Sequence, residues 1–420
     1  MIPDPPSVLV TDAADPQAVA TIRSLGRAGW RVVAVDSDPG APGLRSRSAA
    51  TTHVIPSAQH EPVAALNALA ALSAVEEIDL LLPVCDQSIL ALSPARDRFG
   101  STVIALPAPE SLELAMDKQQ TLALATELGL PIPETRLVTR AEDLQAAAAG
   151  LGWPLVVKPL RSHCPVDDGT VVTQAVGYAT SLDDLETRLA PSGAEIGAEA
   201  LPVLLQRYVT GVGVGVELLA ERGRPLAAFQ HRRLREMPIS GGPSSLRVSE
   251  PVDPGLLRLS TSLLEAMKWT GVAMVEFRTT ADGPVLMEVN GRIWGSMALP
   301  VLSGMDFPRR LAELFLNGAG DIEGIDQSYR MGVECRNLEL ELRWIASALL
   351  QLRRPAAVGP YPGVGEIARV AAGLLDPRIA FDVQSLADPR PGLADLRRST
   401  TNLAREALGR VRHRVGGRTR

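Results

Sequence analysis

The chain has 420 residues, of which 46% are hydrophobic and 21% are charged, and its formal net charge is −6. This balance excludes a disordered chain, a collagen-like chain and a coiled coil, and the length predicts about two to four domains. The acidic net charge argues against nonspecific nucleic-acid binding, and no apolar run approaches the ~18 residues of a membrane span. Three scattered cysteines and a start without a basic or apolar leader predict a reduced, cytoplasmic protein.

The first 115 residues show strands that alternate with helices. Strands are predicted over 7–11, 31–36, 78–83 and 102–105, and a helix over 17–28. This alternation predicts a parallel sheet. Asp36 ends a strand where a dinucleotide-binding domain places its ribose acid, but the turn after the first strand contains no glycine. A doubly wound domain without a dinucleotide site is therefore the favoured interpretation.

A second unit begins near Met116, and its lysines are unusual. Of the 42 basic residues only three are lysine, namely Lys118, Lys158 and Lys268. A GC-rich genome explains the excess of arginine, yet a lysine retained under that pressure is a candidate for a chemical requirement, because arginine does not mimic its compact charge. Lys118 begins a predicted helix that ends near Leu128, and Lys158 lies at the end of a predicted strand.

Two strands near residue 280 form a predicted hairpin that carries acidic residues. Strands over 272–278 and 285–290 flank a loop over 281–283, which suits a three-residue turn that ends in glycine. In that register Glu276 faces Glu288, and Asn290 lies on the same face. Two carboxylates and an amide oxygen, without histidine or cysteine, indicate Mg²⁺ or Mn²⁺. A solvated sheet face with charges directed into water is the alternative.

The lysines and the acidic hairpin together describe a site for a magnesium nucleotide, in which phosphoryl transfer depends on positioning and charge neutralisation. The sequence lacks the Walker motif and the protein-kinase motifs, so another type of ATP site is predicted.

Three runs carry a resemblance to a known family: 230–236, 241–245 and 287–296. With these runs, the chain resembles ATP-grasp enzymes over about residues 7–318. It is most similar to the bacterial group that resembles the carbamoyl-phosphate synthetase large chain and is linked to polysaccharide or peptide biosynthesis. The resemblance implies an α/β and α+β fold: a Rossmann-like preATP-grasp domain over 1–115, an ATP-grasp domain of two α+β subdomains over 116–320 with a lid at about 135–205, and a helical C-terminal extension with a basic tail over 321–420.

The resemblance also implies roles for individual residues. Lys118 and Lys158 match the lysines that bind the α- and β-phosphates of ATP. Glu276, Glu288 and Asn290 match the ligands of Mg²⁺ (or Mn²⁺). Gln206, Arg207, Tyr208 and Val209 match the segment whose backbone, with the Gln206 side chain, reads the adenine edge. Arg292 matches the arginine beside the acyl phosphate. Arg233 and Arg235 match basic strand residues that reach the γ-phosphate or the carboxylate substrate.

The activity implied is that of an ADP-forming carboxylate–amine ligase with small-molecule substrates, no nucleic-acid partner and no integral membrane segment; a homo-oligomer is left open. An inactive nucleotide-binding regulator or scaffold is the alternative, and an oxidoreductase is disfavoured.

Two departures from the family stand out. The phosphate loop 161–169 has one glycine, and glycines over 211–215 replace a ribose-binding acid, with Glu217 further along. His163 and His231 remain open between substrate contacts and structural roles.

Overall fold

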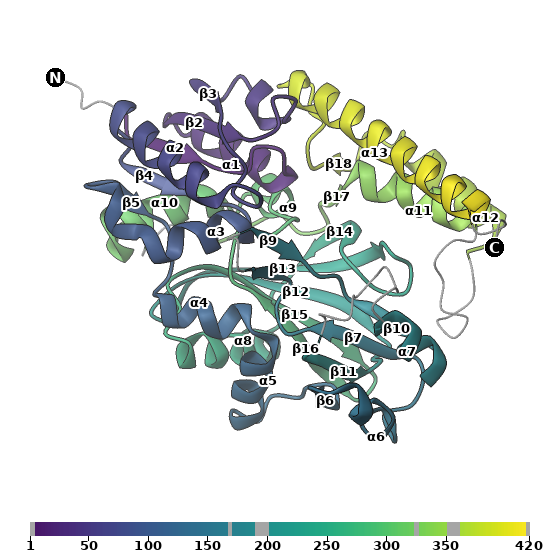
Figure 1. The fold of residues 1–420 in the computed structure, drawn as a ribbon. Helices are drawn as coiled ribbons and strands as arrows, with labels where there is room; N and C mark the ends of the chain where they lie inside the picture. Colours follow the sequence, from purple (N-terminus) through teal and green to yellow (C-terminus); the bar gives the residue numbers. More distant parts are fainter. Residues whose placement is uncertain (1–4, 167–169, 190–200, 323–326, 351–361, 417–420) are drawn as a thin grey trace.

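The computed structural model describes residues 5–166, 170–189, 201–322, 327–350 and 362–416. The tip of the phosphate loop (167–169), part of the predicted lid (190–200) and the end of the basic tail (417–420) lie outside this range. Figure 1 shows the N-terminal unit at the top left, a large sheet through the centre, and the helix α13 along the upper right. No helix among the described residues is long and apolar enough to cross a membrane.

The N-terminal unit contains the predicted parallel sheet, with strand order β3-β2-β1-β4-β5. The apolar runs of β1 and β2 are buried, as expected for parallel strands covered on both faces. The strand β3 was not predicted, because its sequence Thr-Thr-His-Val lacks an apolar run. The elements are β1 (Ser7–Val10), α1 (Pro16–Arg27), β2 (Arg31–Asp36), η1 (Gly43–Arg45), β3 (Thr51–Val54), α2 (Pro62–Val75), β4 (Leu80–Leu82), α3 (Asp86–Leu92), η2 (Ser93–Phe99) and β5 (Val103–Ile104).

Two helices lead from this unit to a small antiparallel sheet. The side chain of Asp117 caps the second helix by accepting from the backbone N–H groups of Gln119 (2.9 Å) and Gln120 (3.1 Å), which fixes Lys118 at its first position. The small sheet has the order β10-β7-β11-β6, and a separate hairpin pairs β8 with β9. The elements are α4 (Pro109–Met116), α5 (Lys118–Glu127), β6 (Thr135–Val138), η3 (Ala141–Asp143), α6 (Leu144–Ala148), β7 (Leu155–Pro159), β8 (His163–Pro165), β9 (Val171–Thr173), β10 (Gly177–Ala179), α7 (Leu182–Leu189) and β11 (Val203–Arg207).

The large sheet has seven strands in the order β16-β15-β12-β13-β14-β17-β18. Its helices include α8, whose N-cap Asp253 accepts from two backbone N–H groups, and α10, which packs against β15. The elements are β12 (Val212–Glu221), β13 (Arg224–Glu236), β14 (Ser244–Glu250), α8 (Pro254–Ala266), β15 (Gly271–Thr280), β16 (Gly283–Asn290), α9 (Ala298–Ser303), α10 (Phe307–Asn317) and η5 (Ala319–Asp321).

The acidic hairpin forms with a different turn from the one predicted. Thr280 pairs with Gly283, so the turn has two residues, Ala281 and Asp282, instead of three. A bulge between Glu276 and Phe277 then shifts the register by one residue. The shift places Glu276 opposite Glu288, the pairing that the sequence predicts.

The C-terminal extension is mainly helical, as predicted, and it also completes the large sheet. The elements are β17 (Glu334–Arg336), α11 (Leu338–Leu350), α12 (Val364–Gly373), β18 (Ala380–Phe381) and α13 (Pro389–Gly416). The start of α13 is tied to the N-terminal unit, since Arg398 donates to the carbonyl of Ala14 (2.8 Å). Arg23 likewise donates to Asp388 at 3.0 Å. The first part of the arginine-rich tail therefore packs against the protein.

Candidate active site

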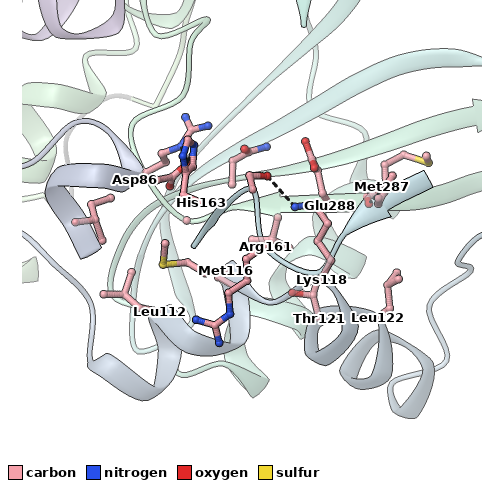
Figure 2. Close-up of a pocket in the computed structure, with 18 of the residues that line it drawn as sticks. Asp86, Leu112, Met116, Lys118, Thr121, Leu122, Arg161, His163, Met287 and Glu288 are labelled. Carbon is pink, nitrogen blue, oxygen red and sulfur yellow. Dashed lines mark hydrogen bonds and ion pairs between the residues drawn. The ribbon is translucent and has the colours of Figure 1, made fainter. Parts of the chain in front are cut away.

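A pocket lies where α4, α5, the β7–β8 segment and the end of β16 meet (Figure 2). Six of the twelve predicted site residues line it: Lys118, Lys158, Gln206, Glu288, Asn290 and Arg292. Apolar side chains from α3, α4, α5 and β16 complete its wall, including Ile89, Leu112, Met116, Leu122 and Met287. The sequence did not single out these apolar residues, because their pattern on helices is the same as that of ordinary core residues.

Two lysines reach the pocket from different elements. Lys118 begins α5, its backbone N–H donates to Leu160 (2.9 Å), and its Nζ donates to the Ser162 hydroxyl at 2.9 Å. Lys158 lies on β7 opposite Leu204, and its Nζ lies 3.4 Å from the Met287 carbonyl. Burial lowers the pKa of Lys158, and Glu288 opposes this effect. The two ammonium groups therefore flank one acidic side chain.

The predicted metal residues converge at the β15–β16 hairpin. Asn290 donates through Nδ2 to Glu276 Oε1 at 3.0 Å, and the other oxygen of Glu276 pairs with Arg233. Burial raises the pKa of Glu276, and Glu288 adds to the rise although Arg233 opposes it. For Glu288 burial also favours the neutral acid, but the cations Lys118, Lys158, Arg233 and Arg292 outweigh it and hold the pKa below its usual value. Glu288 is thus ionised within a surplus of positive charge.

Glycines on β12 allow side chains of β13 to extend over that strand. A Cβ on Gly213 would lie 2.7 Å from Arg233 Cδ, and one on Gly215 would lie 2.4 Å from His231 Cε1. This observation explains the Gly-x-Gly-x-Gly run as a place of close approach. Through this gap Arg233 reaches Glu276, on the far side of β12. Arg233 therefore contacts Glu276, a predicted metal ligand, but does not line the pocket.

The adenine segment divides into one pocket residue and three that lie elsewhere. Gln206 is fully buried; its Nε2 donates to Thr135 Oγ1 at 3.0 Å, and its Oε1 has no partner among the described residues. Arg207 instead pairs with Glu134 at 2.6 Å, and the Tyr208 hydroxyl donates to the Ser240 carbonyl at 2.8 Å. Val209 is half-buried and does not line the pocket. The side chains of Arg207 and Tyr208 therefore make structural contacts, and the predicted backbone contacts of this segment with adenine stay a prediction.

Arg235 is also placed away from the pocket. Its Nη1 lies 2.7 Å and 2.5 Å from the two carboxylate oxygens of Glu341, and its guanidinium lies 5.2 Å from the centre of the Trp344 ring. The register of β13 shifts between Arg233 and Arg235, and their side chains therefore point in different directions. Arg235 thus contacts α11 in this structure and does not line the pocket, and its predicted role at the substrate stays a prediction.

His231 and Glu217 form a buried pair. The His231 Nδ1 lies 2.9 Å from Glu217 Oε1, which also accepts from the Ser296 hydroxyl at 3.2 Å. Burial raises the pKa of Glu217 well above its usual value and lowers that of His231. Glu217 is fully buried and faces this network, a placement that does not fit a ribose ligand.

Arg292 is held by a residue that sequence analysis missed. Its Nε donates to Asp86 Oδ2 at 3.1 Å, although the two residues are 206 positions apart. His163 lies beside them, with Nε2 at 3.4 Å from the same Asp86 oxygen. His163 thus lines the pocket from the β8–β9 hairpin, where the family has a glycine-rich loop. No local pattern marks Asp86, because its role depends on the packing of distant segments.

A family model described as ATP-grasp in the biosynthetic pathway with Ter operon matches residues 199–336. The carbamoyl phosphate synthase large chain of Xylella fastidiosa is 28% identical over 255 residues, which cover 58% of this chain and 22% of that protein. The chain spans about a fifth of the length of the curated relatives it matches.

Solved structures share the fold. The biotin carboxylase domain of 2-oxoglutarate carboxylase from Hydrogenobacter thermophilus, solved with magnesium ADP and bicarbonate, matches with a TM-score of 0.59 at 15% identity, over 78% of this chain and 73% of that one. The L-amino acid ligase from Bacillus licheniformis matches with a TM-score of 0.56 at 15% identity, over 74% of each chain. The family model thus identifies residues 199–336 as an ATP-grasp segment, and the solved structures share the fold of a longer part of the chain.

Proposed function

We propose that the chain is an ADP-forming ligase that activates a small-molecule carboxylate with Mg-ATP and joins it to an amine. The observation that carries the proposal is the convergence of Lys118, Lys158, Glu288, Asn290 and Arg292 on one pocket. With Arg161 and Asp86, which also line the pocket, four cations face two carboxylates, and this positive surplus suits the polyphosphate of a nucleotide. The roles of these residues, and the division into units at about 115 and 320, are part of the proposal.

The nucleotide would lie with its base at Gln206 and its phosphates at the two lysines. The unpartnered Gln206 Oε1 is buried and is suited to accept from an exocyclic amino group of adenine. Apolar side chains of α4 and α5, such as Met116 and Leu122, would pack against the ring. Lys118 and Lys158 would then neutralise phosphate oxygens.

The donor set fits a magnesium ion that binds together with the nucleotide. Glu276, Glu288 and Asn290 offer oxygens only, and the described residues contain no cluster of three or more histidines, cysteines or acids that could hold a metal alone. Mg²⁺ typically takes one or two carboxylates and completes its shell with phosphates and water. When bound, it would neutralise charge on the transferred phosphoryl group.

The chemistry proposed has two steps. An oxygen of the substrate carboxylate attacks the γ-phosphorus, the bond to the ADP oxygen breaks, and an acyl phosphate forms. The amine nitrogen then attacks the acyl carbon, phosphate leaves, and the amine loses a proton. Arg292 would stabilise the oxyanion charge that develops in both steps, as a positioned cation in a shielded site does.

The test is ADP release from the purified chain across a panel of carboxylates and amines. We expect release that requires Mg²⁺, ATP and both organic substrates, and that chelation by EDTA abolishes. A chain that binds Mg-ATP but releases no ADP with any pair would favour the inactive regulator. A chain that binds NAD and not ATP would contradict the proposal.

A further inference from the structure

Two of the three guanidinium nitrogens of Arg292 are held by the protein. Nε donates to Asp86 Oδ2 at 3.1 Å, and Nη1 donates to the Ile293 carbonyl at 3.2 Å. Within the described part of the chain, Nη2 has no hydrogen-bond partner. The planar guanidinium is therefore fixed on two edges, and one nitrogen is left for an anionic oxygen in the pocket that it lines.

The carboxylate of Asp86 joins three separate parts of the molecule. Asp86 is the first residue of α3 in the N-terminal unit, Arg292 follows β16, and His163 belongs to the β8–β9 hairpin. The hairpin has a second tie to the N-terminal unit, because Val171 N–H donates to the Gln59 carbonyl at 2.7 Å. One acidic side chain thus connects the β8–β9 hairpin with Arg292, and His163 and Arg292 both line the pocket.

The surroundings of His163 indicate which nitrogen carries its proton. Nδ1 lies 3.4 Å from Gln87 Nε2, an amide donor, and 3.1 Å from Thr173 Oγ1. With Nδ1 as the acceptor, the proton is on Nε2 and faces Asp86. Burial lowers the pKa of His163, Asp86 opposes this, and Arg292 and Lys118 lower it further. Because a neutral His163 ring carries no charge, the Asp86 carboxylate forms its ion pair with Arg292.

We propose that Asp86 is the positioning residue for Arg292, and that it sets the guanidinium for the anionic intermediate while His163 holds the same carboxylate oxygen. This proposal rests on the ligase function above. Asp86 itself would not touch the reacting atoms. A small misplacement of a group such as Arg292 costs up to about 100-fold in rate, so the effect of losing Asp86 is expected in turnover.

The kinetic test compares variants of Asp86 with a matched control. In Asp86→Ala we expect kcat for ADP release to fall about 10- to 100-fold, with KM for ATP within about threefold. Asp86→Asn keeps an acceptor oxygen without the charge and should fall less, and Asp86→Glu should recover part of the loss. Asp97→Asn removes an exposed acid from the same unit and should keep the wild-type kcat. An unchanged kcat in Asp86→Ala, or a loss confined to KM for ATP, would overturn the positioning role.

A second readout does not need ligase activity. Nitrogen-15 NMR of the His163 ring follows its titration in the wild type and in Asp86→Asn. This measurement does not depend on Asp86→Ala, so it applies even if that variant does not fold. We expect the His163 pKa to fall in Asp86→Asn, because the carboxylate that favours the imidazolium is gone. An unchanged His163 pKa would overturn the shared contact. If the wild type releases no ADP with any substrate pair, the ligase function fails, and this titration still decides the contact.

Discussion

Two regions of the large sheet present arginines to their surroundings in different ways. On β13 and β14, two arginines have an acidic partner from the C-terminal extension: Arg235 pairs with Glu341 and Arg247 with Asp382. After β16, Arg292 shares Asp86 with His163 and keeps one nitrogen unpaired among the described residues. The side chains of Arg235 and Arg292 are similarly exposed, at 20% and 25%. Neither residue type nor exposure separates Arg235 from Arg292; the shared carboxylate and the unpaired nitrogen of Arg292 do.

The same contrast holds for buried carboxylates. Asp12, in the N-terminal unit, has no cation beside it in the part of the chain that the structure describes, and burial raises its pKa to about 6. Glu288, in the pocket, lies among four cations that hold its pKa below the usual value. A carboxylate kept ionised inside a cationic pocket is what a magnesium-nucleotide site requires, whereas Asp12 is satisfied by hydroxyl and backbone donors.

The largest effect is expected for Arg247, whose charge is balanced by the buried Asp382. Arg247→Met would leave Asp382 buried without its cation, and unfolding free energy should fall by about 3–5 kcal/mol. Denaturant unfolding measures this loss. The double variant Arg247→Met with Asp382→Leu should recover most of the stability, since neither charge then remains. A single variant as stable as the wild type would show that this pair is not the charge-balanced contact described.

Removal of Arg292 should have the opposite effect: a large loss of turnover and little change in stability. In Arg292→Ala we expect kcat for ADP release to fall about 10²- to 10³-fold, because the developing oxyanion loses its positioned cation. The midpoint of thermal unfolding should stay within a few degrees, and ATP binding should be retained. Steady-state ADP release measures the first quantity. Normal turnover in this variant would contradict the role of Arg292.

Asp12 gives a smaller, pH-dependent effect. Its folded pKa is above that of the unfolded chain, so its stabilising contribution is fully present below about pH 4 and is lost as pH rises through about 6. Over this window the wild type should lose up to about 3 kcal/mol relative to Asp12→Asn. Asparagine also suits the left-handed backbone at this position, where φ is +59°. Parallel stability–pH curves for the two proteins would contradict the shifted pKa.

Local patterns accounted for much of the fold and for part of the site. The apolar strands of the N-terminal sheet and the pairing of Glu276 with Glu288 follow from alternation and turn residues, although the turn itself was mispredicted. A one-residue bulge compensates for the shorter turn, and sequence patterns do not reveal such a bulge. The polar strand β3 gave no signal.

Residues whose role depends on distant partners could not be predicted. Arg235 was expected at the substrate because a basic strand looks the same whether its charges face a ligand or a helix. Only the fold shows that Glu341 neutralises it. Asp86 was missed for the converse reason, since its partners Arg292 and His163 come from other segments. Within residues 206–209, Gln206 is buried and Arg207 is exposed, although the preceding residues of β11 are buried on both faces, so alternation does not predict the difference.

The most direct test of the central claim, that the charge surplus in this pocket exists to bind Mg-ATP, is nucleotide-dependent thermal stability in two lysine variants. Wild type at about 100 times the dissociation constant should gain about 2.7 kcal/mol from Mg-ATP, a shift of several degrees. Lys158→Met should abolish the shift, whereas Lys268→Met, at an exposed position, should keep it. A wild type that shows no shift with Mg-ATP, or a Lys158→Met variant that keeps the full shift, would contradict the account.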